Sequence, residues 1–162
     1  MEMSFKEKSA WISLISTLCI FGYYFYNIAM LQGEPLEQAK DAALALLSKA
    51  IILSIIVEVV FHSMLAATNH KAAKLGADER DKLFEYKANN IGYTILVIGV
   101  ITTLMFIIGG EYVGEWGNSE ELADMLKSRQ IPLHTAHILM FFFILSEIVR
   151  FAGQIFYYRR GV

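Results

Sequence analysis

The stretch Leu133–Tyr158, LHTAHILMFFFILSEIVRFAGQIFYY, is long enough to cross a bilayer and carries a glutamate and an arginine well inside it. A second stretch, Ala43–Ala67, ALALLSKAIILSIIVEVVFHSMLAA, places Glu58 and His62 at nearly the same depth. A carboxylate surrounded by hydrocarbon is costly, so an ionisable residue inside a span indicates a functional site by default. These two stretches therefore decide the fold class and direct the search for a site.

Four segments reach the roughly 20 apolar residues that a spanning helix needs, and the sequence predicts spans over 9–31, 43–67, 91–109 and 133–158. Pro35 suits a helix start, so the second helix should begin before its span. The 162 residues are 56% hydrophobic and 19% charged, which is typical of a small integral membrane protein. We predict one membrane domain over residues 1–162, an all-α four-helix transmembrane bundle.

Lysine and arginine near the span ends predict the orientation. Most of them precede the first span, lie in loop 68–90, or follow the fourth span: Lys6, Lys8, Lys71, Lys74, Arg80, Lys82, Lys87, Arg159 and Arg160. The other two loops hold only Lys40, Lys127 and Arg129. Both termini and loop 68–90 are therefore predicted to be cytoplasmic, and outer loop 110–132 is predicted to carry a short surface helix. The net charge of −2 gives no indication of a nucleic-acid surface.

The two halves of the chain resemble each other at two places. Phe5-Lys-Glu-Lys8 before the first span is similar to Phe84-Glu-Tyr-Lys87 before the third. Glu58-Val-Val-Phe-His62 in the second span is similar to Glu147-Ile-Val-Arg-Phe151 in the fourth. Because internal repeats recur in membrane proteins, these similarities favour a parallel duplication of a two-helix hairpin.

Polar side chains recur at helical spacing and form a stripe on several spans. The stripes are Ser9, Ser13 and Thr17 on span one, Ser54, Glu58 and His62 on span two, and Glu147, Arg150, Gln154 and Tyr158 on span four. Glu58 and Glu147 are each about 12–16 Å from the inner boundary. One interpretation is a polar pocket, open to the cytoplasm, that holds a cation or relays protons between these carboxylates and His62. The other is structural pairing between helices, with Glu58 or Glu147 bonded to Arg150.

Other ionisable residues suggest less. Lys49 lies on the opposite side of its helix from Glu58, and we expect it to extend toward the outer surface. His134 and His137 are the only candidate metal pair, but two imidazoles without a nearby acid or cysteine make a weak site. Haem between facing histidines needs matched depth, and His62 lies toward the inner side while the other two lie toward the outer. No cofactor is predicted, and no catalytic motif supports an enzyme.

The charged run Asp78, Glu79, Arg80 and Asp81 is predicted to begin a helix that continues without interruption into the third span. Asp78 can cap that helix, and acidic residues suit its positive end. The run could anchor a cytoplasmic partner or a second subunit. The alternative is a capped and solvated helix end.

The passage Asp78–Tyr93, DERDKLFEYKANNIGY, resembles a family of small prokaryotic four-span membrane proteins of unknown function. That family is marked by an Asp-Glu-Arg-Asp box that leads into Lys-Ala-Asn and Gly-Tyr at the start of the third span. This chain departs from the pattern at Asn90, where a basic residue is more usual, and at Phe84, where we expect an aliphatic one. The resemblance implies a four-span topology in a prokaryotic plasma membrane, and it implies no activity.

Three functional hypotheses follow. The first is a non-enzymatic membrane protein, a homo-oligomer, that senses or binds a partner through its charged cytoplasmic helix and inner polar pocket. The second is a transport component that moves protons or a small cation by way of Glu58, His62 and Glu147. The third is a membrane redox protein with haem. The predicted partners are the lipid bilayer, a second copy of the chain and a cytoplasmic protein.

Overall fold

The computed structural model describes residues 3–31, 34–116 and 133–161. In this part of the chain the elements are α1 (Phe5–Met30), α2 (Leu36–Thr68), the short α3 (His70–Leu75), α4 (Glu79–Trp116) and α6 (His134–Arg160). The four long helices are each long and apolar enough to cross a membrane. The protein is therefore an all-α, multi-pass membrane protein, as predicted. Most of the outer loop, where the sequence predicts a surface helix, lies outside the described residues.

The helix ends follow from local sequence. The Ser4 hydroxyl accepts a hydrogen bond from the Glu7 backbone N–H at 3.1 Å, which caps α1. Pro35 precedes α2, which begins at residue 36 and thus ahead of its predicted span. Helix α4 begins at residue 79 and passes directly into the third span, as expected. Gly161 ends α6 in the left-handed region, at φ +70°, which glycine adopts without a steric penalty.

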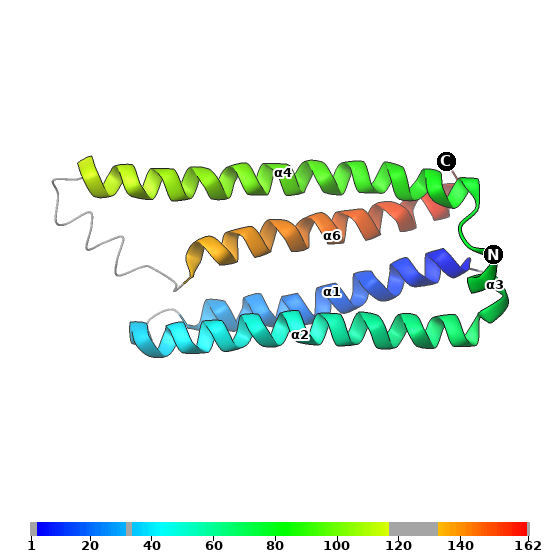
Figure 1. Ribbon diagram of the computed structural model, residues 1–162, viewed down its shortest axis with the longest axis horizontal. Helices are drawn as coiled ribbons and strands as arrows, with labels where there is room; N and C mark the ends of the chain where they lie inside the picture. The colour runs from blue at the N-terminus through cyan, green and yellow to red at the C-terminus, as the bar shows by residue number, and fades with distance from the viewer. Residues whose placement is uncertain (1–2, 32–33, 117–132, 162) are drawn as a thin grey trace.

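The long helices lie in the order α4, α6, α1, α2, with α1 and α6 in the middle (Figure 1). The extensive interfaces are α4 with α6, α1 with α2, and α1 with α6. Both termini and α3 lie at one end (Figure 1), which we call the inner end because the sequence predicts that it is cytoplasmic. A parallel duplication would exchange α1 with α4 and α2 with α6. In this row α1 lies inside and α4 lies at the edge, so the two hairpins do not occupy equivalent positions. The row gives the duplication no support, and it stays a prediction.

An apolar core lies in the outer half of the molecule between three helices. It consists of Phe21, Tyr24 and Ile28 of α1, Ala43 and Ala50 of α2, and Ile144 of α6. Inside it, the Tyr24 hydroxyl forms a hydrogen bond with Nδ1 of His137 on α6. Many large apolar side chains of α2 and α4 are exposed instead. They suit a lipid-facing surface, because lipid replaces water around a spanning helix.

Glycines allow α4 and α6 to approach closely. A Cβ at Gly99 of α4 would lie 2.2 Å from Cβ of Phe142 on α6, and one at Gly92 would lie 3.0 Å from the Ser146 carbonyl oxygen. On the other helix, a Cβ at Gly153 would lie 3.4 Å from Cβ of Ala88. Small residues at such contacts are the usual basis of helix packing in membranes. The second hairpin is therefore held by close backbone approach.

Candidate functional site: an inner polar pocket

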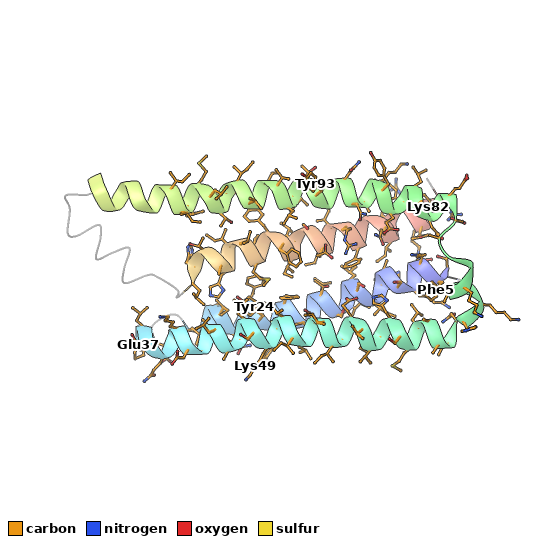
Figure 2. All side chains as sticks on the ribbon, viewed as in Figure 1. Phe5, Tyr24, Glu37, Lys49, Lys82 and Tyr93 are labelled. Carbon is orange, nitrogen blue, oxygen red and sulfur yellow. The ribbon has the colours of Figure 1, made fainter. Side chains whose placement is uncertain are left out.

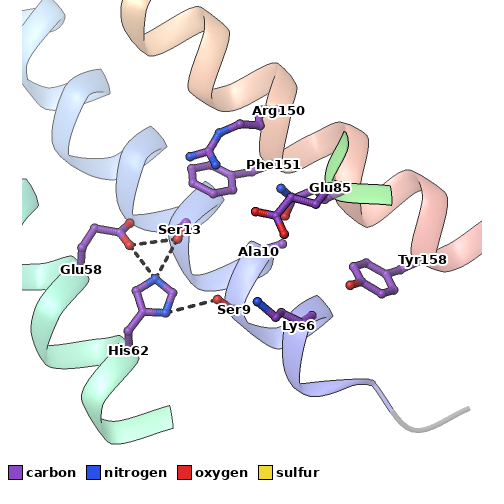
Figure 3. A pocket seen from close by; sticks show the side chains of 11 residues that line it. Lys6, Ser9, Ala10, Ser13, Glu58, His62, Glu85, Arg150, Phe151 and Tyr158 are labelled. Atoms are coloured by element: carbon purple, nitrogen blue, oxygen red, sulfur yellow. Dashed lines mark hydrogen bonds and ion pairs between the residues drawn. The ribbon is translucent and has the colours of Figure 1, made fainter. Parts of the chain in front are cut away.

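A cavity of about 240 Å³ lies near the inner end, and all four long helices contribute to its wall. Ser13 comes from α1, Glu58 and His62 from α2, Glu85 from α4, and Arg150 from α6. Figure 3 shows Glu58 and His62 on one side of this space and Arg150 on the other. The lining thus carries both signs of charge.

A network of hydrogen bonds surrounds Glu58. Its Oε2 lies 2.6 Å from Nε2 of His62, one turn along the same helix, and 2.9 Å from the Ser13 hydroxyl. Its Oε1 accepts a bond from the Ser16 hydroxyl at 3.0 Å. The Ser13 oxygen is also 3.0 Å from Nε2 of His62, and the Ser9 oxygen is 3.3 Å from Nδ1 (Figure 3). Three serines of α1 therefore hold the carboxylate and the imidazole of α2.

The chemistry of this network follows from its donors and acceptors. An ionised carboxylate only accepts hydrogen bonds, so Nε2 of His62 carries a proton when it bonds Glu58. Serine hydroxyls both donate and accept, so the same three serines can satisfy the pair after it gains or loses a proton. The arrangement is suited to holding a proton or a small cation.

The second intramembrane carboxylate has a different partner. Arg150 donates from Nη2 to Oε2 of Glu147, one turn earlier on α6. Arg150 lines the cavity, whereas Glu147 is not among the lining residues. Nε of Arg150 is buried and has no hydrogen-bond partner among the described residues. Glu58 therefore faces the pocket, whereas Glu147 is paired with Arg150 within α6 and not between helices as one interpretation of the sequence expected.

Of the remaining residues in the predicted stripes of spans two and four, two line the cavity and one does not. Gln154 and Tyr158 line the cavity. Ser54 is not among the lining residues, and its hydroxyl donates to the Ile51 carbonyl of its own helix at 2.8 Å.

Sequence reasoning did not single out three residues at this site, which are Ser16, Lys6 and Glu85. Ser16 continues the helical spacing of Ser9 and Ser13, so the sequence held a signal for it. Nothing in the sequence links Lys6 with Glu85, and only the packing of helices brings them to one cavity.

The Asp-Glu-Arg-Asp run lies beside this pocket and is partly used for structure. The Asp81 N–H donates to Oδ1 of Asp78 at 2.6 Å, and the Asp78 N–H donates to Oδ2 of Asp81 at 3.2 Å. The Tyr158 hydroxyl donates to Oδ1 of Asp81 at 2.6 Å. Glu79 and Arg80 stay exposed, with the Arg80 guanidinium 5.1 Å from the centre of the Phe84 ring. At the same end of the molecule, an ion pair connects α1 with α6: Oε1 of Glu7 is 2.7 Å from Nε of Arg159.

The histidines of the outer half lie apart from the inner pocket. His137 is buried and bonded to Tyr24, while His134 is exposed, with its ring 5.9 Å from that of Phe106. Within residues 3–31, 34–116 and 133–161, no three His, Cys, Asp or Glu side chains gather in a way that could hold a metal ion. The depths of His62 and His137 can be compared through their contacts on α1. His62 contacts Ser13 and His137 contacts Tyr24, which is eleven residues further along that helix. That spacing is about 16 Å along a helix, so His62 and His137 are not at the matched depth that a bis-histidine haem requires.

Comparisons with protein-family models, with curated proteins and with solved structures find no match to this chain. The family resemblance of residues 78–93 therefore stays a prediction, and the pocket is interpreted from its geometry alone.

Proposed function

We propose that this protein is a non-enzymatic membrane sensor that responds to protonation of the Glu58–His62 pair in its inner polar pocket. The contact between this carboxylate and this imidazole, held by serines from a second helix, carries the proposal. Histidine is the side chain whose charge ordinarily changes between about pH 5 and pH 8. The pair lines a cavity of about 240 Å³ with polar and charged walls, which has room for the water that would carry protons to it.

The way the helices pack supports a conformational response. The two hairpins meet mainly through α1 and α6, and the pocket lies where all four helices converge. A change in charge on α2 therefore acts across the junction on Arg150 of α6 and Glu85 of α4. A ligand shifts a conformational equilibrium only through different interactions with the two states, and a proton on this pair alters its attraction to every charge in the lining.

A physical link connects the pocket with the exposed end of α4. Tyr158 lines the cavity, and its hydroxyl donates to Asp81. Asp81 in turn caps the helix start together with Asp78. Glu79 and Arg80 stay exposed beside this cap. We infer that they form the surface that a cytoplasmic partner or a second copy of the chain binds.

Sensing is favoured over transport because an apolar core, and no polar path, lies between Glu58 and the outer end in the described part of the chain. Above Glu58 the space between α1, α2 and α6 holds the apolar core around Phe21 and Tyr24. A transport component that moves protons or a small cation is the second candidate, since the Glu58–His62 pair is also suited to relaying protons. That role would require the core to open. The haem hypothesis has no matched pair of histidines to support it in the described part of the chain.

The placement in the cell rests on sequence. The positive-inside pattern and the resemblance of residues 78–93 support a prokaryotic plasma membrane with both termini in the cytoplasm. The single-domain organisation and the homo-oligomeric state belong to the same proposal.

A spin label at position 79 tests the sensor. The variant Glu79→Cys is made in a Cys19→Ser background, labelled, placed in liposomes and measured by electron paramagnetic resonance at pH 5 and pH 8. The mobility of the label should differ between the two conditions, and His62→Gln and Glu58→Gln should each remove the difference. The matched control is Ser54→Ala, on the same stripe but bonded only within its own helix, which should keep it. A pH response that survives in both pocket variants overturns the proposal.

Proteoliposome flux separates the two candidates. With a pH-sensitive dye inside the vesicles, the sensor hypothesis expects proton flux equal to that of empty liposomes. Flux above that level, abolished by Glu58→Gln, would establish transport instead. Flux that survives Glu58→Gln and Glu147→Gln together would exclude the predicted transport residues.

A further inference from the structure

A second cavity, of about 430 Å³, lies between α1 and α2. Its walls are mainly apolar and include Cys19, Ile20 and Tyr23 of α1 with Leu46, Lys49 and Leu53 of α2. It shares no lining residue with the inner pocket. We call it the α1–α2 groove, and Lys49 is the only charged side chain among the described residues that line it.

Lys49 is exposed although it belongs to a candidate span. Its side chain projects from the side of α2 that points away from the other long helices (Figure 2). The ion pairs of the described chain are those of Glu58, Glu147 and Glu7, and Lys49 takes part in none of them. A cation on a lipid-facing surface is costly unless it extends to the interface or meets an anion. An anionic group from the surrounding bilayer would therefore stabilise the charge of Lys49.

The depth of Lys49 suits a lipid headgroup. The predicted span begins near residue 43, so the Cα of residue 49 lies about 9 Å inside it. The flexible stem of a lysine can cover most of that distance and bring its ammonium to the phosphate layer. Tyr23, 66% exposed in the same groove, is the amphipathic type of side chain that is enriched at this level of a membrane.

We propose that the α1–α2 groove is a binding site for an anionic phospholipid. One acyl chain lies along the apolar wall between the two helices, and the phosphate meets the ammonium of Lys49. An anionic headgroup is favoured because a zwitterionic one already carries a cation that competes for its own phosphate. This site is independent of the inner pocket and of the sensing role.

Native mass spectrometry of the detergent-solubilised protein tests the headgroup preference. The protein is titrated with phosphatidylglycerol or phosphatidylcholine of identical acyl chains. A lysine near the membrane surface contributes about 1 kcal/mol of attraction to anionic lipid, so we expect about fivefold tighter binding of phosphatidylglycerol. Lys49→Gln should remove this preference, and Lys49→Arg should retain it. Lys40→Gln, which changes an exposed lysine of the same helix outside the groove, should also retain it. An unchanged preference in Lys49→Gln overturns the proposal.

Cys19 provides a readout of position, because it is the single cysteine of the chain and lines the groove. Its rate of modification by a small thiosulfonate reagent is measured in nanodiscs of either lipid. Phosphatidylglycerol should slow the reaction more than phosphatidylcholine does, and Lys49→Gln should make the two rates equal. Equal rates in the unmodified chain would show that no anionic lipid occupies the groove. Unfolding temperatures of all variants are compared first, so that loss of the fold is not mistaken for loss of the site.

Discussion

Glu58 and His62 lie one turn apart on α2, with Oε2 of the carboxylate 2.6 Å from Nε2 of the imidazole, and one hydroxyl of α1 contacts both. This pair joins the first hairpin at its inner half, where the apolar core does not reach. The same contacts thus serve stability and, in the proposed function, proton binding. Hydrogen bonds between helices in membranes contribute about 0.6 kcal/mol each on average and up to about 1.7.

Ser13→Ala should lower the free energy of unfolding by about 1 kcal/mol, because it removes two polar contacts between α1 and α2. The effect is measured by unfolding in detergent micelles. Ser54→Ala is the matched control, since its hydroxyl bonds only to its own helix, and it should change the stability by less than about 0.5 kcal/mol. A double-mutant cycle of Ser13→Ala with Glu58→Gln should show coupling. Strictly additive effects would contradict the network.

Gly99→Ala should lower the free energy of unfolding by about 1–3 kcal/mol, because the new methyl group overlaps Phe142 and overpacks the α4–α6 interface. Gly22→Ala is the control, with nothing within 4 Å of its added Cβ. The unfolding temperatures of both variants provide the measurement. Phe142→Gly, which removes the Cβ that the new methyl group overlaps, should combine with Gly99→Ala less than additively. If both glycine variants unfold alike, close packing at residue 99 is not what holds the second hairpin.

Asp78→Ala should weaken the start of α4 by about 1 kcal/mol, the usual effect of losing a helix cap. Asp81→Ala should weaken it further, because that carboxylate also accepts the Tyr158 hydroxyl. Hydrogen exchange of the amides in residues 79–84 measures both changes. Glu79→Ala serves as the control, since its side chain is exposed. Equal protection in all three variants would contradict the role of the two aspartates.

Cysteines introduced at positions 74 and 160 should react with a membrane-impermeant maleimide from one side of the membrane. A cysteine introduced at position 37 should react from the other side. The expectation follows from the arrangement in Figure 1, where α3 and the C-terminal end of α6 lie at the same end of the molecule. The variants Lys74→Cys, Arg160→Cys and Glu37→Cys are made without Cys19 and labelled in intact and in opened cells. Labelling of Lys74→Cys and Arg160→Cys only after opening would also support the predicted orientation. Reaction of these two variants from opposite sides would contradict the fold.

Much of the architecture was accessible from local pattern. Apolar length predicted four spanning helices, because a helix is how a chain satisfies its backbone inside lipid. Pro35 and Asp78 predicted where α2 and α4 begin, since the effects of proline and of capping are confined to a single turn. The polar stripes predicted that Glu58 and His62 share a face, because that follows from helical geometry alone.

What the sequence by itself determined about this protein is its class, where α2 and α4 begin, and which side chains share a face of one helix. Only the tertiary structure decided which faces meet. It placed Glu58 against the serines of α1, whereas Glu147 pairs with Arg150 on its own helix, although the two glutamates looked alike along the chain. It also brought Lys6 and Glu85 to one cavity. The reason is physical: periodicity fixes direction within a helix, whereas the rotation and order of helices depend on contacts between residues far apart in sequence.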